Sequence, residues 1–296
     1  MQDSLRHSAR NHHATRRAFL VRFLGLVTVS VISAPSLAEP SRTGTLYLVG
    51  VGPGDADMMT IRAARTIEKA EIVYVSPGVA ERLREYLAGK QVIEGYWQLF
   101  WYYGMKPEEV PPGEKEAFER ITAQRSQFIA QVRSQLAQGK TVAILDNGDA
   151  LVYGPWAWIL EEFSDVNPVV IPGVSAFNAA HAALRKSPTI SPRTKSVILT
   201  ANDWPGKTDT IPELARLGVP MAIFTMRAEF ESFIEKLRTS LPDSTPVAVV
   251  EHAGYKDKER VILGTLGDIT QKVSGNQLAF EYLIYVGDFI TYRQKK

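Results

Sequence analysis

Apolar and polar positions follow a strand, turn, helix and strand pattern from residue 45 onward. Residues 45–51 form a short apolar run rich in β-branched side chains, which Gly52, Pro53 and Gly54 interrupt. The apolar spacing of residues 58–69 is typical of a helix, and residues 70–75 are again apolar and β-branched. This order predicts a βαβ unit with a parallel pair of strands.

The remaining pattern predicts a second domain. Residues 124–138 read as an amphipathic helix, residues 141–145 as a strand before a polar turn, and residues 168–171 as a strand that stops at Pro172-Gly173. Later strands are predicted at residues 196–200, 221–225, 246–251, 260–265 and 282–286. The last three lie close together in the chain, which favours antiparallel pairing. We therefore predict two α/β domains, 44–171 with a mostly parallel sheet and 172–293 with a mixed sheet.

The first 38 residues read as an export signal and are excluded from the fold prediction. The run from Thr15 to Leu20 includes Arg16-Arg17 and resembles a twin-arginine signature. An apolar stretch at residues 23–34 follows, and Ser36-Leu37-Ala38 offers the small residues that a signal peptidase reads. This stretch is shorter than the roughly 20 residues of a spanning helix. We expect cleavage and a periplasmic protein, with an uncleaved anchor as the alternative.

Charge and cysteine content exclude several function classes. The net charge is +2, but residues 1–38 carry five arginines and one acid, +4, which leaves +2 − 4 = −2 for the rest. A nearly neutral body gives no electrostatic reason to expect a nucleic acid partner. The chain has no cysteine, and only two of its histidines follow residue 38, so we expect neither disulfides nor a transition-metal site.

Several short motifs occur in the order found in one enzyme family. Gly50-Val51-Gly52-Pro53-Gly54-Asp55 lacks the spacing of a dinucleotide fingerprint and the Gly-Lys-Ser/Thr of a phosphate loop. By itself it is explained equally well as a tight turn and as a loop where a ligand approaches the backbone. Its companions are Asn147-Gly148-Asp149 with Tyr153-Gly154, Ile171-Pro172-Gly173-Val174-Ser175-Ala176, Ile223-Phe224-Thr225-Met226, residues 245–253, residues 264–266 and Tyr285-Val286-Gly287. Together they cover nearly all of the chain after the signal and resemble the tetrapyrrole (corrin/porphyrin) methylases.

The resemblance implies a homodimeric methyltransferase that binds S-adenosylmethionine (SAM) in a cleft between the two domains. The implied cofactor contacts are Pro53, Gly54, Asn147, Gly148, Asp149, Val152, Ser175, Ala176, Met226 and Ala253. Glycine and alanine let backbone groups approach a ligand, and Asp149 is suited to accept a hydrogen bond from a cationic ligand or to face it.

Three departures from the family pattern bear on the reaction. Ser76 occupies the position of a proposed catalytic acid in uroporphyrinogen methylases, which argues against that reaction. Ala150 replaces the proline of the family's Gly-Gly-Asp-Pro turn, whose first glycine is Asn147 here, and Glu281-Tyr282 replaces Pro-Ala before the last strand. The catalytic residues stay unknown, and the candidates are Tyr153, Arg125 and Asp146; Asp146 is also explained as an ordinary turn residue. His252 and His181 are expected to be structural.

The segment 95–103 contains six aromatic residues. It reads either as a packed cluster under a long loop or as an aromatic wall for a flat ligand. Two other functions stay open on the same fold: peptide backbone N-methylation of the borosin type, and a periplasmic protein that binds a ligand without catalysis. An exported protein has no local supply of SAM, which favours the second of these, whereas the retained glycine loop and Asp149 favour catalysis.

Overall fold

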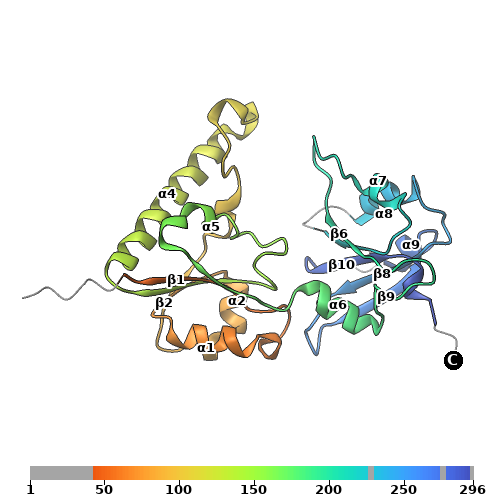
Figure 1. Ribbon diagram of the computed structural model, residues 1–296. Coiled ribbons are helices and arrows are strands. Elements are labelled where there is room, and N and C mark those ends of the chain that lie inside the picture. Colours follow the sequence, from red (N-terminus) through yellow and green to blue (C-terminus); the bar gives the residue numbers. More distant parts are fainter. Residues whose placement is uncertain (1–42, 226–229, 274–277, 294–296) are drawn as a thin grey trace, which may run out of the picture. The chain divides into compact units, whose positions relative to one another are not determined.

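The first sheet of the computed structural model is entirely parallel (Figure 1). Its strands are β1 (Thr45–Gly50), β2 (Ile72–Val75), β3 (Gln91–Glu94), β4 (Thr141–Asp146) and β5 (Val169–Ile171), in the order β3-β2-β4-β1-β5. Side chains of the central strands are buried on both faces, which explains their continuous apolar runs. Because all five strands run the same way, the loops that follow neighbouring β1 and β4 meet at one edge.

Helices cover both faces of this sheet (Figure 1). One face carries α1 (Ile61–Lys69), α2 (Pro77–Arg82) and α3 (Arg84–Leu87), and the other carries α4 (Lys115–Ala137) and α5 (Ile159–Glu162). The first helix begins three residues later than predicted because the Thr60 hydroxyl accepts a hydrogen bond from the Ala63 N–H at 3.1 Å and caps it. The long helix α4 begins nine residues before its predicted start.

The second sheet is mixed, as predicted. Its strands are β6 (Ile198–Ala201), β7 (Met221–Phe224), β8 (Pro246–Glu251), β9 (Arg260–Thr265) and β10 (Tyr282–Val286), in the order β6-β7-β10-β8-β9. Strands β6 and β7 are parallel, whereas β10 is antiparallel to β7 and β8, and β8 is antiparallel to β9. The predicted antiparallel pairing of the last three strands is therefore confirmed.

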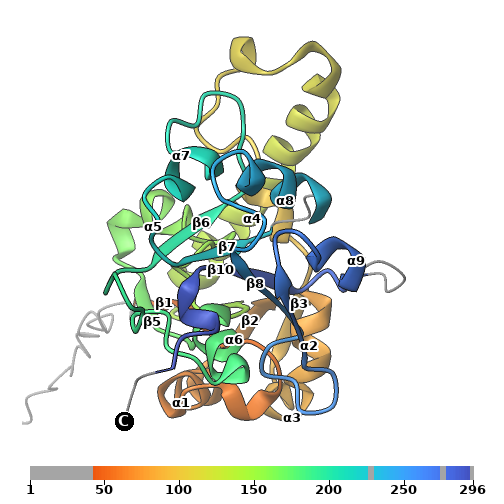
Figure 2. The ribbon, with the colours of Figure 1, turned by 90° about the vertical axis from the view of Figure 1, so that its right-hand side faces the viewer.

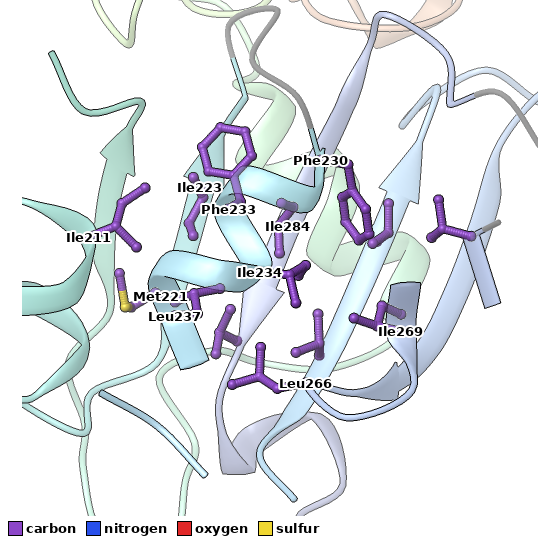
Figure 3. Close-up of a cluster of buried hydrophobic side chains, with 14 of the residues drawn as sticks. Ile211, Met221, Ile223, Phe230, Phe233, Ile234, Leu237, Leu266, Ile269 and Ile284 are labelled. Atoms are coloured by element: carbon purple, nitrogen blue, oxygen red, sulfur yellow. The ribbon is translucent and has the colours of Figure 1, made fainter. Parts of the chain in front are cut away.

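Two clusters of apolar side chains hold helices onto the second sheet. Helices α7 (Ile211–Ala215), α8 (Phe230–Arg238) and α9 (Ile269–Val273) pack on one face, where Phe233, Ile234 and Ile284 lie at the centre of the cluster (Figure 3). Helix α6 (Ala176–Leu184) and the short 3-10 helix η6 (Asp288–Ile290) pack on the opposite face (Figure 2). The chain thus passes from β5 of the first sheet directly to a helix of the second.

The structure describes residues 43–225, 230–273 and 278–293. The other short 3-10 helices are η1 (Ala56–Met58), η2 (Trp97–Phe100), η3 (Pro107–Glu109), η4 (Pro112–Glu114) and η5 (Ser164–Val166). None of the helices in these ranges is long and apolar enough to cross a membrane. The predicted export signal, residues 1–38, lies outside the described residues and stays a prediction. The predicted class of two α/β domains is confirmed, while its boundary at residue 172 stays a prediction.

Candidate functional site

Three chain segments meet at the carboxyl edge of the first sheet, and glycine is required where they touch. Gly52 and Gly148 exchange backbone hydrogen bonds of 3.1 and 3.0 Å. A Cβ atom on Gly173 would lie 2.0 Å from the Gly148 carbonyl oxygen, and one on Gly50 would lie 2.6 Å from the Gly173 nitrogen. The loop after β1, the loop after β4 and the segment after β5 are thus in backbone contact. Side chains at these positions would force them apart.

The glycine loop, residues 52–55, also contacts the loop that follows β8. Gly52 and Gly54 have φ angles of 73° and 70°, a conformation that favours glycine. A Cβ on Gly54 would lie 2.2 Å from the backbone of Gly254, and the Asp55 N–H donates to the Gly254 carbonyl at 3.0 Å. Pro53 and Gly54 are buried. The loop therefore joins the first sheet to the second and has little room to move.

Asp149 fixes the loop after β4 to the segment after β5. Its carboxylate accepts hydrogen bonds from the Leu151 N–H at 2.9 Å and from the Gly173 N–H at 3.2 Å. The Asp149 carbonyl accepts a further bond from the half-buried Val152 at 3.2 Å. The structure thus gives this implied cofactor contact a role in shaping the loop.

Asp146, the last residue of β4, is a buried carboxyl group. It is 4% exposed, and its Oδ2 atom has no hydrogen-bond partner among the described residues. Burial raises the pKa of Asp146 to about 8, although backbone N–H groups of Asn147 and Trp156 oppose the shift. A Cβ on Gly154 would lie 2.5 Å from Oδ2 and 2.2 Å from the Ala150 carbonyl oxygen. Any side chain at position 154 would therefore clash with the Asp146 carboxyl group and with the backbone.

Tyr153 connects the loop after β4 with the end of β7. Its ring lies 4.6 Å from the ring of Phe224, and its side chain is 38% exposed. Burial, followed by the charge of Asp209, raises the pKa of the Tyr153 phenol. The backbone of Tyr153 has φ of 60°, which is unusual for a residue with a side chain. The candidate thus lies between the two sheets with its hydroxyl protonated at neutral pH.

The implied contacts in the second half of the chain gather around the start of α6. Ser175 is buried, and its hydroxyl accepts a hydrogen bond from the Phe177 N–H at 3.3 Å, so it caps this helix. Ala176 and Ala253 belong to the same apolar cluster. Met226 lies outside the described residues.

A cavity of about 510 Å³ opens beside the end of β8. It is lined by Glu251, His252, Lys258, Arg260, Leu278 and Ala279. The Glu251 carboxylate is buried and accepts hydrogen bonds from the Arg260 guanidinium and from the Ala279 N–H. None of the implied cofactor contacts is among these lining residues.

Arg125 lies away from these loops and holds the aromatic segment. The residue is 8% exposed, and its Nη1 atom donates to the carbonyls of Leu99 at 2.7 Å and Trp101 at 2.9 Å. Burial lowers the pKa of this guanidinium. The guanidinium therefore has a structural task, and nothing in its contacts marks a catalytic one.

The aromatic segment itself is mostly packing. Leu99 is buried in the core under α4, and Tyr96, Phe100 and Tyr103 pack against that core. Trp101 is 39% exposed. Of the two interpretations of this segment, these contacts support the packed cluster under a loop. Trp101 has the most exposed ring of the segment.

Comparison with known proteins decides the family. The family model described as tetrapyrrole (corrin/porphyrin) methylases matches residues 45–270. The chain belongs to the tetrapyrrole methylases. It is 31% identical over 254 residues to the cobalt-precorrin-4 C(11)-methyltransferase of Methanocaldococcus jannaschii, covering 83% of this chain and 88% of that protein. Membership makes it a methyltransferase that uses SAM as the methyl donor.

Solved structures agree on the fold of this tetrapyrrole methylase. The X-ray structure of a cobalt precorrin-4 methyltransferase, a cobalamin biosynthetic enzyme, superposes with a TM-score of 0.67 at 22% identity and covers 86% of this chain and 99% of that one. A uroporphyrin-III C-methyltransferase from Thermus thermophilus, complexed with S-adenosylhomocysteine, gives a TM-score of 0.60 at 21% identity and covers 84% and 99% of the two chains. The two-domain fold predicted from the motifs is thereby confirmed.

One residue of the site was not found in the sequence. Arg82, at the end of α2, donates to the carbonyls of Gly52 and Gly54 and to the side chain of Asn147. Two of these acceptors are backbone atoms, which leave no residue pattern to detect. Ser76, the departure from the uroporphyrinogen methylases, precedes the same helix, and its side chain makes no capping hydrogen bond there. The His181 ring packs against Phe177, and the His252 ring lies beside Tyr255 with its Nδ1 atom 3.7 Å from a Glu281 carboxylate oxygen; their structural roles stay predictions.

Proposed function

We propose that this methyltransferase transfers the methyl group of SAM to a tetrapyrrole, with SAM bound where the loops after β1, β4, β5 and β8 meet. The observation that carries the proposal is the backbone contact among Gly50, Gly148 and Gly173, with Gly54 against Gly254. Four loops from both sheets are brought together at one place by residues without side chains. Such an arrangement lets a ligand reach backbone donors and acceptors from several directions.

The residues at this place suit the chemical groups of SAM. A Cβ on Gly148 would meet the Ala176 nitrogen at 3.7 Å and the Val174 oxygen at 3.9 Å, both ordinary contact distances, so a small group fits beside this residue. As the first residue of α6, Ala176 has an N–H without an acceptor inside the helix. A carboxylate such as that of the methionine part of SAM is stabilised at such a helix start. The small residues Ala176 and Ala253 leave room for the rest of the cofactor.

The protein's task in methyl transfer is mainly to align and to exclude water. SAM supplies an activated methyl group on a sulfonium, whose leaving group needs no proton. The loops would hold the cofactor so that the methyl faces the acceptor in line, which replaces an unfavourable bimolecular encounter. Tyr153 and Phe224 form an aromatic surface beside this position, suited to a flat conjugated acceptor.

We propose a precorrin-type acceptor rather than uroporphyrinogen. The relative from Methanocaldococcus jannaschii acts on cobalt-precorrin-4 at carbon 11 by its name. The serine at position 76, where uroporphyrinogen methylases carry an acid, supports the same choice.

We further propose that the protein is exported to the periplasm by the twin-arginine route, is cleaved after Ala38 and forms a homodimer. The resemblance of residues 15–38 to an export signal supports the export and the cleavage.

Calorimetry with SAM and S-adenosylhomocysteine tests the cofactor site. We expect micromolar binding of both. In Asp149→Asn the amide cannot reproduce both charge-assisted bonds to backbone N–H groups, so we expect binding to weaken about 10- to 100-fold. Asp165→Asn is the control, since Asp165 pairs with Arg133 in the same half of the chain and touches none of the four loops in the described contacts.

The acceptor is tested separately by mass spectrometry. Incubation with SAM and reduced tetrapyrroles should add one methyl group, a gain of about 14 Da, to a precorrin-type acceptor. Methylation of a peptide backbone instead would point to a borosin-like reaction. Well-folded protein that binds neither nucleoside would disprove the proposed cofactor site and leave a ligand-binding protein as the better interpretation.

A further inference from the structure

Arg82 ties together two of the loops that meet at the carboxyl edge of the first sheet. Its Nη1 atom donates to the Gly52 carbonyl at 3.0 Å and also to the Gly54 carbonyl. Its Nη2 atom donates to the Asn147 Oδ1 atom at 3.2 Å. One planar guanidinium therefore holds both left-handed turns of the glycine loop and the first residue of the loop after β4.

The surroundings of this guanidinium strengthen these bonds. Arg82 is half-buried, and burial lowers its pKa, while Tyr255, Glu281 and Asp55 oppose that shift. A guanidinium stays protonated at neutral pH despite such a shift. Hydrogen bonds from a charged donor out of water are stronger than those between neutral groups. Glu281 and Tyr255 belong to the second half of the chain, so the same cation is also attracted to that side.

The side chain of Asn147 gives Arg82 a hydrogen-bond acceptor that the family pattern lacks. The family pattern has glycine at this position, and glycine has no side-chain acceptor for Arg82. Asn147 is exposed, so the apolar core does not require it. Its recorded side-chain partner is the guanidinium of Arg82. The departure from the family pattern and the arginine are thus explained together.

We infer that Arg82 is a positioning residue for the cofactor and that Asn147 is its partner. Arg82 touches loop atoms rather than reacting atoms, and it acts by holding the glycine loop and the loop after β4 in the arrangement that receives SAM. This inference rests on the proposed cofactor site. It assigns a binding role to a residue that the family motifs do not include.

The test compares Arg82→Ala, Arg82→Lys, Asn147→Gly and the double variant Arg82→Ala/Asn147→Gly. Loss of the three charge-assisted bonds should raise the Kd of SAM and of S-adenosylhomocysteine at least about tenfold in Arg82→Ala. Lysine can reach a single carbonyl and should restore part of the affinity. Asn147→Gly should weaken binding about threefold, for the loss of one bond. The double variant should match Arg82→Ala within about twofold, because both changes remove the same contact.

Arg133→Ala is the matched control. Arg133 also donates to a backbone carbonyl, that of Glu162 at 2.8 Å, and to a carboxylate, Asp165, but it lies on α4 away from the four loops. Both arginine variants should lower the melting temperature, whereas only Arg82→Ala should weaken binding. In turnover, a positioning role predicts a raised KM for SAM with a smaller change in kcat.

Two results would overturn the inference. One is an Arg82→Ala variant that binds both nucleosides within twofold of the unchanged protein. The other concerns amide hydrogen exchange of residues 50–56 and 146–152, measured without ligand. Arg82→Ala should accelerate this exchange and Arg133→Ala should not. Exchange in Arg82→Ala as slow as in the unchanged protein contradicts the positioning role. If the unchanged protein binds neither nucleoside, the proposed function fails, and the exchange measurement still decides whether Arg82 holds the loops.

Discussion

Replacing Asp146 by asparagine should remove a pH dependence of stability that this carboxyl group imposes. Burial raises the pKa of Asp146 from 3.8 to about 8. Between these values the folded protein keeps the proton that the unfolded chain releases. The group's contribution is therefore fully present below about pH 4, falls as the pH rises, and is lost by about pH 8. Asparagine has no such proton and stays neutral over the whole range.

The size of the effect follows from proton linkage. One proton bound by the folded state and not by the unfolded state changes the free energy of unfolding by about 1.4 kcal/mol per pH unit. From pH 5 to pH 7, Asp146→Asn should therefore gain about 2.7 kcal/mol relative to the unchanged protein. Taking the difference between the two proteins at each pH cancels the other titrating groups that they share.

Urea unfolding at pH 5, 6 and 7 measures this difference from the midpoint and slope. Glu119→Gln is the control, because it replaces an exposed carboxylate of α4 by an amide, and its difference should stay flat. A flat difference for Asp146→Asn as well would refute the reasoning. Asp146 would then be ionised in the folded protein, and the orphaned Oδ2 would need another partner.

Three further substitutions test the packing around the site. Gly54→Ala places a Cβ 2.2 Å from the backbone of Gly254 at a φ of 70°, and should cost about 1–3 kcal/mol of stability; an unchanged melting temperature would contradict the close approach. Ser175→Ala removes the cap of α6 and should cost about 0.5–2 kcal/mol in urea unfolding, whereas Ser175→Thr should retain most of it. Arg125→Met leaves the buried Leu99 carbonyl and the part-buried Trp101 carbonyl without this donor and should cost about 1–3 kcal/mol, with a change in near-UV circular dichroism from the aromatic segment; an unaltered spectrum would contradict its role there.

The buried strands could be predicted because burial on both faces requires continuous apolar runs in the sequence. Strands β1, β2 and β4 are covered by helices on both faces, so nearly every residue must be apolar. Strand β3 was missed because it is four residues long at a sheet edge, and its side chains are mostly exposed. The first turns of α4 were missed because they follow a proline-containing polar stretch and bury little before Ile121. Short edge strands and exposed helix starts have no apolar period to detect.

The glycine motifs of the candidate site can be found in the sequence because the fold requires glycine there. A Cβ on Gly50 or Gly173 would clash with the neighbouring backbone, and Gly148 has a φ angle of 74°, so the chain must keep glycine at these positions and a motif results. The burial of Asp146 and the unpaired state of its Oδ2 depend on how residues 147–156 fold over it, which no local pattern encodes. The role of Arg82 depends on backbone carbonyls from another loop.

The polar candidates near the loops favour a reaction that depends on alignment rather than on a strong base. Asp146 has a pKa of about 8, so at neutral pH it is mostly protonated and suited to donate rather than to accept a proton. Asp149 uses both carboxylate oxygens on backbone N–H groups. The pKa of Tyr153 is raised, so its phenol stays neutral. Methyl transfer to an electron-rich ring carbon is compatible with these three residues, because the bond to the methyl group forms before a proton must leave. Methylation of a peptide backbone would instead require a base to remove the amide proton. None of these three residues supplies such a base.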